Sequence, residues 1–121
     1  RAGATVLVMG LTFKENCADI RNSKVIDIVH ELQEHGLKVV IWDPIADAHE
    51  AHEEYGVTMV ADWHTVPRVD AVVVAVAHTR IKALTPAELV TAFGKGTPVI
   101  DIKSVFDRGA FAAAGLPLWR L

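Results

Sequence analysis

Short, mainly apolar runs alternate along the chain with polar or amphipathic stretches, and this alternation predicts the secondary structure. Apolar runs that end at glycine, proline or a polar turn are typical of buried strands. The sequence predicts strands over residues 5–9, 37–42, 57–60, 71–76, 97–102 and 118–121. The run 71–76 contains no polar residue, as a strand covered on both faces requires, so we expect it at the centre of a sheet.

Helical spacing and capping residues predict the helices that separate these strands. Apolar residues recur at helical spacing from Val25 to Leu32, with Asn22 or Ser23 able to cap the start and Gly36 able to end the helix. Shorter helices are predicted over 46–55, 85–94 and 107–114, with one helical turn over 62–66. The alternation predicts an α/β fold, a three-layer α/β/α Rossmann-like sandwich with a mostly parallel sheet of five to six strands.

Composition narrows the classes of protein that fit. A chain of 121 residues suits a single domain spanning 1–121, and 51% hydrophobic with 22% charged residues excludes a disordered tail. A net charge of −3 gives no bulk attraction to nucleic acid or to an anionic membrane. With one cysteine and no 18-residue apolar run, we expect a cytoplasmic protein with neither nucleic acid nor membrane as partner. Because the first strand follows Arg1 almost at once, we expect a piece of a longer protein.

A long polar connection, residues 10–24, links the first strand to the first helix. In open α/β sheets, ligands bind at the carboxyl ends of the strands, where this connection lies. The ring of Phe13 could cover a base or a sugar, and Lys14 and Arg21 could meet phosphate. Lys103 follows the strand 97–102 and therefore falls at the same edge. These four residues are the candidate ligand contacts.

Asp43 ends the second strand, where dinucleotide-binding folds place an acid that binds ribose. However, Gly10 does not begin a G-x-G-x-x-G pattern, and the loop after it is long and charged. We therefore interpret Asp43 as a turn residue and do not expect this domain to be a dinucleotide-binding one.

Two other candidate sites are weaker. The histidines and glutamates within 49–53 share a helical face, but they lack the H-E-x-x-H spacing and a third distant ligand, so we predict no metal. Cys17 could act as a nucleophile only with a nearby base, and we interpret it as an incidental loop thiol. We assign no catalytic residue within the chain.

The residues alone leave two further function classes open. A receiver-like signalling domain shares this topology and could use Lys103, although Gly10-Leu11 stands where its acidic pair would follow the first strand. A free-standing α/β nucleotide-binding module without catalysis is the other alternative.

Two short motifs carry a family resemblance. Gly10-Leu11-Thr12-Phe13-Lys14, followed by Asp19-Ile20-Arg21-Asn22-Ser23, resembles the G-x-x-F-K…D-x-R-x-S signature that opens the C-terminal domain of the UDP-glucose/GDP-mannose dehydrogenase family. The segment Thr-Phe-Lys-Glu-Asn-Cys, residues 12–17, is most similar to the branch of the family that oxidises UDP-N-acetylhexosamines for bacterial surface polysaccharides. The similarity continues through Asp43-Pro44, the strand at 71–75 and residues 99–103, and so covers nearly the whole chain.

The resemblance implies the UDP-binding domain of an NAD-dependent UDP-sugar 6-dehydrogenase whose NAD-binding and central domains lie outside this chain. In such enzymes the C6 hydroxyl is oxidised to a uronic acid by two hydride transfers to NAD, through a thiohemiacetal and a thioester on an upstream cysteine. A homo-oligomeric parent enzyme is expected.

The same resemblance assigns roles to four residues. Phe13 and Lys14 would touch the UDP-sugar substrate, and Arg21 would reach the nicotinamide end of NAD. Lys103 stands where the family has an arginine that contacts substrate, so the charge is kept but the bidentate fork is lost.

Overall fold

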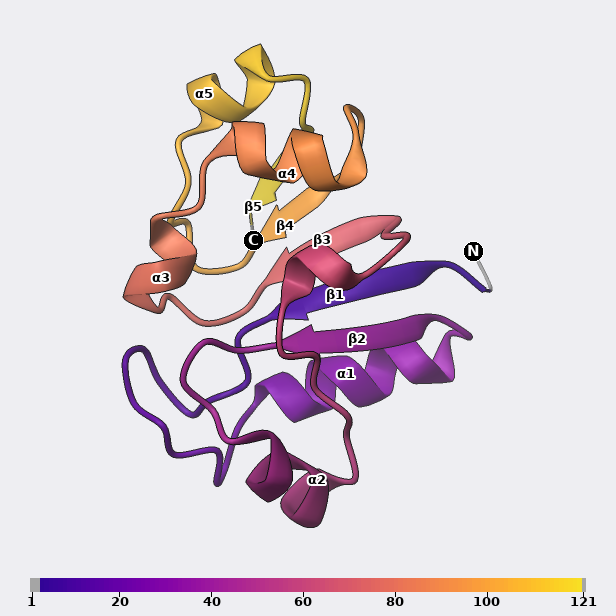
Figure 1. Cartoon of the computed structure of the whole chain (residues 1–121), viewed down its shortest axis with the longest axis vertical. Coiled ribbons are helices and arrows are strands. Elements are labelled where there is room, and N and C mark those ends of the chain that lie inside the picture. Colours follow the sequence, from indigo (N-terminus) through magenta and orange to yellow (C-terminus); the bar gives the residue numbers. More distant parts are fainter. Residues whose placement is uncertain (1–2, 121) are drawn as a thin grey trace.

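The computed structural model describes residues 3–120, which form a five-stranded parallel sheet flanked by helices (Figure 1). The strands are β1 (Thr5–Met9), β2 (Lys38–Trp42), β3 (Ala71–Val74), β4 (Val99–Asp101) and β5 (Leu118–Arg120). Their order in the sheet is β2-β1-β3-β4-β5, which confirms the predicted central place of β3. The pairing of each strand with its neighbour is parallel throughout.

Most of the helices lie where the sequence predicts them. They are α1 (Val25–Glu34), α2 (Ala48–Tyr55), the 3₁₀ turn η1 (Trp63–Thr65), α3 (Thr79–Lys82), α4 (Pro86–Phe93) and α5 (Arg108–Ala113). Thr85 caps α4 through a reciprocal capping box with Glu88, and Asp47 caps α2 by accepting from two backbone N–H groups. None of the helices within residues 3–120 is long and apolar enough to cross a membrane.

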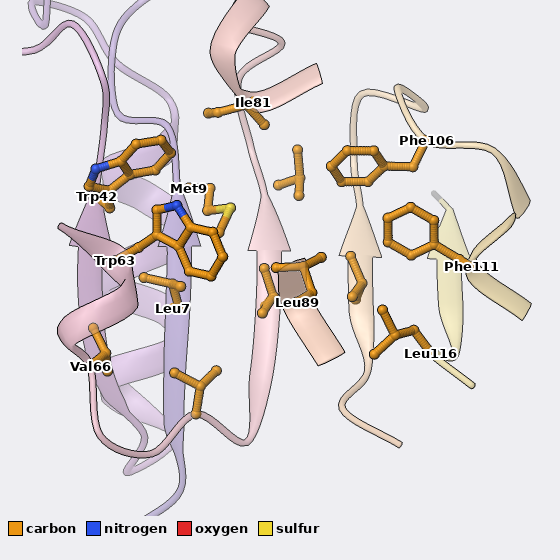
Figure 2. Packing of buried hydrophobic residues seen from close by; sticks show 14 residues of the cluster. Leu7, Met9, Trp42, Trp63, Val66, Ile81, Leu89, Phe106, Phe111 and Leu116 are labelled. Atoms are coloured by element: carbon orange, nitrogen blue, oxygen red, sulfur yellow. The ribbon is translucent and has the colours of Figure 1, made fainter. Parts of the chain in front are cut away.

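Two apolar cores lie on opposite faces of the sheet, so the predicted three layers are confirmed. Side chains alternate between the faces along a strand, so Leu7 and Met9 enter one core and Val6 and Val8 the other. The first core, shown in Figure 2, packs the sheet against η1, α3, α4 and α5. The second core packs it against α1 and α2.

Three details differ from the sequence predictions. The strand predicted over 57–60 is wrong, because the segment makes only an isolated bridge between Met59 and Ile41. Helix α3 was not predicted. The N-cap of α1 is Lys24, although Ser23 Oγ does accept from the N–H of Val25 at 3.3 Å. Leu121, the last residue of the predicted edge strand, lies outside the described residues.

Gly10 sets how the chain leaves β1. Its φ is +102°, and a Cβ at this position would lie 2.7 Å from Val76 Cβ and 2.8 Å from Val76 N. Those distances are shorter than a carbon contact allows, so only glycine lets the chain pass this close to the end of β3. The glycine of the sequence motif therefore brings residues 11–16 and the segment after β3 to the same edge of the sheet.

Candidate functional site

A cleft of about 480 Å³ opens at the carboxyl ends of β1, β3 and β4. It is lined by Thr12, Phe13, Lys14, Glu15, Lys24, Val25, Ile28, Ala75, Val76, Ala77, Ile102 and Lys103. The structure thus brings together three of the four predicted contact residues: Phe13, Lys14 and Lys103. Lys24, which sequence reasoning did not single out, lines the same cleft from the start of α1.

The lining of the cleft combines apolar surface with positive charge. Phe13 is 54% exposed, which is unusual for a large apolar side chain and leaves its ring accessible. Lys14, Lys24 and Lys103 are also exposed, and Glu15 adds one acidic group among the described lining residues. Such a surface can bind a ligand that joins a planar or sugar ring to an anionic group.

A larger groove of about 590 Å³ lies beside α1, towards the amino ends of the strands. Its described lining is apolar apart from Asp70, and it contains no lysine or arginine. It is therefore a poor match for an anionic ligand, although it is more spacious than the cleft.

We call residues 11–16 the arch. Asp43 anchors the first part of the arch. Its Oδ2 accepts from the backbone N–H groups of Leu11 (2.7 Å) and Thr12 (3.3 Å). Its Oδ1 accepts from those of Ile45 and Ala46, at 2.8 Å each. Burial alone would raise the pKa of the Asp43 carboxyl, but these N–H groups outweigh burial and hold the pKa below its usual range. The geometry agrees with the sequence interpretation of Asp43 as a turn residue.

His78 anchors the arch from the other side. Its fully buried ring follows β3, and Nδ1 accepts from the backbone N–H of Asn16 at 2.8 Å. Because an amide N–H only donates, Nδ1 carries no proton and the ring proton lies on Nε2. Nε2 is 2.9 Å from Asp43 Oδ2 and 3.0 Å from Thr12 Oγ1, both of which accept. The sequence signal for His78 was its position just after the central strand.

Asn16 and Thr12 complete the hydrogen bonding of the arch. Asn16 has a φ of +55°, a left-handed conformation that asparagine adopts more readily than most residues, and its Oδ1 accepts from the N–H of Thr79 at 2.9 Å. Thr12 Oγ1 donates to the carbonyl of Lys14 at 2.9 Å. The exposed side chains of Phe13 and Lys14 therefore stand on a backbone that is held on both sides.

The second half of the connection is fixed by side chains of the D-x-R-x-S motif and of α2. Ser23 Oγ donates to the carbonyl of Leu11 at 2.5 Å, and the Ser23 N–H donates to Tyr55 Oη at 3.3 Å. The Tyr55 hydroxyl in turn donates to the carbonyl of Ile20. The serine of the motif therefore has a structural role.

Asp101 positions the loop that carries Lys103. Its fully buried carboxylate accepts from the N–H groups of Val105 (3.1 Å) and Phe106 (2.9 Å). Ser104 takes a left-handed φ of +55° and its N–H lies 3.3 Å from the carbonyl of Asp101. This tight turn directs Lys103 towards the cleft that Lys14 also lines.

Arg21 is not among the residues that line the cleft. Its guanidinium pairs bidentately with Asp19, at 3.0 Å from Nε to Oδ1 and 3.1 Å from Nη2 to Oδ2, while its side chain is 77% exposed. The hydrogen bonds from Arg21 hold the pKa of Asp19 below its usual range. The structure thus places Arg21 apart from the other three predicted contacts.

The turn after β1 does not have the geometry of a glycine-rich dinucleotide-binding turn. After β1, the backbone N–H groups of Leu11 and Thr12 donate to Asp43, so they are not directed at a pyrophosphate. Within residues 3–120 there is no group of three or more histidine, cysteine or acidic side chains placed to hold a metal ion, and Cys17 is a free thiol.

The sequence of the chain matches a known protein family and several of its members. Residues 7–108 match the model of the UDP-glucose/GDP-mannose dehydrogenase family, UDP binding domain. The chain is 45% identical over 106 residues to UDP-N-acetyl-D-glucosamine 6-dehydrogenase of Pseudomonas aeruginosa, a match that covers 87% of the chain and 25% of the relative. It is 44% identical over 104 residues to the enzyme of the same name from Salmonella typhi, covering 85% of the chain and 24% of the relative.

Solved structures agree on the fold. NDP-N-acetyl-D-galactosaminuronic acid dehydrogenase from Methanosarcina mazei superposes with a TM-score of 0.87 at 21% identity, covering 98% of the chain and 24% of that protein. The chain therefore spans about a quarter of the length of the relatives it matches. These comparisons give no support to the receiver-like or free-standing alternatives.

Proposed function

This chain belongs to the UDP-glucose/GDP-mannose dehydrogenase family, and on that premise we propose that its cleft binds the UDP-sugar substrate of a UDP-N-acetylhexosamine 6-dehydrogenase. The observation that carries the proposal is the convergence of Phe13, Lys14 and Lys103 on one cleft at the carboxyl edge of the sheet. These residues come from two loops separated by most of the chain, and the two curated relatives named above are UDP-N-acetyl-D-glucosamine 6-dehydrogenases.

The chemistry of the cleft suits a UDP-sugar. Lys14 and Lys103 would pair with the diphosphate, and the exposed ring of Phe13 would cover the base or the sugar. Lys103 provides a point charge without the fork of an arginine, so its contact with phosphate depends less on orientation. Lys24 would add a third cation at the same cleft.

The chain's share of catalysis is positioning. Anchoring the nucleotide at a distance from C6 fixes where the reacting carbon lies, and such positioning can lower a barrier by several kcal/mol. Oxidation of a primary alcohol to a carboxylate removes four electrons and adds the oxygen of one water. Two NAD⁺ would accept the electrons as hydrides, with NAD held mainly by a domain outside this chain. Arg21 would contact that cofactor across the domain boundary.

The proposed enzyme is a cytoplasmic homo-oligomer that supplies uronic acids for surface polysaccharides. Its test is NADH formation, followed by absorbance, when the full-length protein is given UDP-N-acetylglucosamine and NAD⁺. We expect two NADH per sugar from the full-length protein. The isolated 121-residue chain is the control and should fold but form no NADH. Absence of turnover with any UDP-N-acetylhexosamine, or NADH formed by the isolated chain, would contradict the proposal.

A further inference from the structure

The residues that hold the arch are buried and far from it in sequence. Asp43 and His78 have no exposed side-chain surface, and their contacts with the arch span 31 to 66 positions of the chain. Neither residue is among those that line the cleft. Any influence they have on a bound ligand must therefore act through the backbone that carries Phe13 and Lys14.

We propose that His78 is a positioning residue for the UDP-sugar: it holds the arch in the conformation that presents Phe13 and Lys14 to the cleft. This inference rests on the proposed function of the cleft. Nδ1 fixes the backbone after Lys14 through the N–H of Asn16. Nε2 fixes the backbone before Phe13 through Asp43 and Thr12, so one ring connects both ends of the arch.

The hydrogen bonds determine which tautomer does this. The Asn16 amide requires an acceptor at Nδ1, and the Asp43 carboxylate requires a donor at Nε2. A side chain that supplies only the acceptor or only the donor would hydrogen-bond to the arch at one end only. The second contact of Asn16, from its Oδ1 to the N–H of Thr79, adds to the hold on the same side.

The consequence for binding follows from preorganisation. An arch that is ordered before the ligand arrives does not have to be ordered by the ligand. If loss of the His78 ring lowers the binding-competent population of the arch to about one tenth, the apparent dissociation constant rises about tenfold. No group that touches the ligand is removed in that case.

The test is calorimetric binding of UDP, the probe ligand, to the full-length protein and its variants. His78→Ala should raise the dissociation constant about tenfold or more, and His78→Asn, which keeps an acceptor near the place of Nδ1, should recover part of the loss. The matched control is Ile81→Ala, because Ile81 is fully buried in α3 but its aliphatic side chain packs in the core and cannot hydrogen-bond to the arch. It should lower the melting temperature without changing the affinity for UDP.

A second variant tests the added hold on the arch by the Asn16 side chain. Asn16→Gly changes an exposed residue, retains the backbone N–H and the left-handed φ, and removes only the Oδ1 contact with Thr79. It should weaken UDP binding about threefold.

Unchanged affinity in a folded His78→Ala protein, or wild-type affinity in His78→Asn if only that variant folds, would overturn the positioning role, because asparagine has no donor at the place of Nε2. An equal loss of affinity in Ile81→Ala would also overturn it. Lys14→Ala separates this failure from that of the proposed function. If Lys14→Ala weakens UDP binding and the His78 variants do not, only the positioning role is wrong. If none of them weakens it, the cleft is not the UDP site.

Discussion

The imidazole of His78 and the carboxylate of Asp43 meet at 2.9 Å between Nε2 and Oδ2, and both side chains are fully buried. The pair lies where the ends of β2 and β3 face the start of the arch. Unlike a catalytic pair, it is closed off by its own hydrogen bonds: Asp43 accepts from four backbone N–H groups and His78 Nδ1 accepts from a fifth. Its function is to fix the polypeptide around the cleft.

Asp43→Asn should destabilise the domain at neutral pH. An amide offers one acceptor and one donor where the carboxylate accepts at both oxygens, so an N–H group would face the amide donor. We expect a loss of about 1–3 kcal/mol in the free energy of unfolding. Urea denaturation at pH 7 measures it, with Asp27→Asn as the control for removing one exposed acid from α1.

Asp43→Asn should also change how the free energy of unfolding depends on pH. The pKa of Asp43 is lower in the folded protein than its ordinary value of 3.8, so its carboxylate stabilises the fold above that pH. The stabilisation should be lost as the pH falls through the lower folded pKa. Wild-type stability should therefore fall more steeply below about pH 4 than that of Asp43→Asn. Equal slopes in the two proteins would show that Asp43 is not held as described.

Gly10→Ala should be more harmful than the same change at another left-handed glycine. Gly96 has a φ of +88° and no atom within 4 Å of the place that a Cβ would take, so Gly96→Ala adds only backbone strain, whereas Gly10→Ala adds overlap with Val76. We expect Gly10→Ala to lose about 1–3 kcal/mol more than Gly96→Ala, from thermal unfolding of both variants. Similar losses would mean that β1 does not pass Val76 as closely as the structure shows.

Arg21→Ala should weaken NAD use in the full-length enzyme while leaving UDP binding largely intact. The reason is that Arg21 lies outside the cleft. Its side chain is exposed and, among the described ion pairs, is held only by Asp19. Arg68→Ala is a close control, because Arg68 is similarly exposed and pairs with Asp70 two residues away at 3.2 Å. The KM for NAD should rise in Arg21→Ala alone. Weaker UDP binding with normal NAD use would show that Arg21 serves the other ligand.

Much of the fold could be predicted because each main strand is a local apolar run and most helices carry their own caps. The failures are elements whose existence depends on distant partners. Residues 57–60 resemble a strand in sequence, yet only Met59 pairs with β2, whereas the three-residue β5 is fully paired with β4. Helix α3 has four residues and no side-chain cap, which leaves no periodicity to detect.

The candidate site, too, could be predicted from the sequence only in part. Phe13, Lys14 and Lys103 could be predicted together because each follows a strand, and parallel strands end at one edge of the sheet. The role of His78 could not, because its partners are 35 to 66 positions away and its ring is buried among them. Lys24 was overlooked because it opens a helix, where a lysine normally faces solvent.

The central claim is that the cleft binds the UDP moiety, and calorimetric titration of UDP into the full-length protein tests it most directly. A charge-assisted contact is worth about 1.5–3 kcal/mol, so Lys14→Ala should raise the dissociation constant about ten- to a hundredfold. Lys103→Ala should cause a smaller loss. Lys38→Ala removes the same charge at the opposite edge of the sheet, where β2 begins, and should bind UDP like the wild type. Affinity unchanged by Lys14→Ala, or reduced equally by Lys38→Ala, would contradict the account.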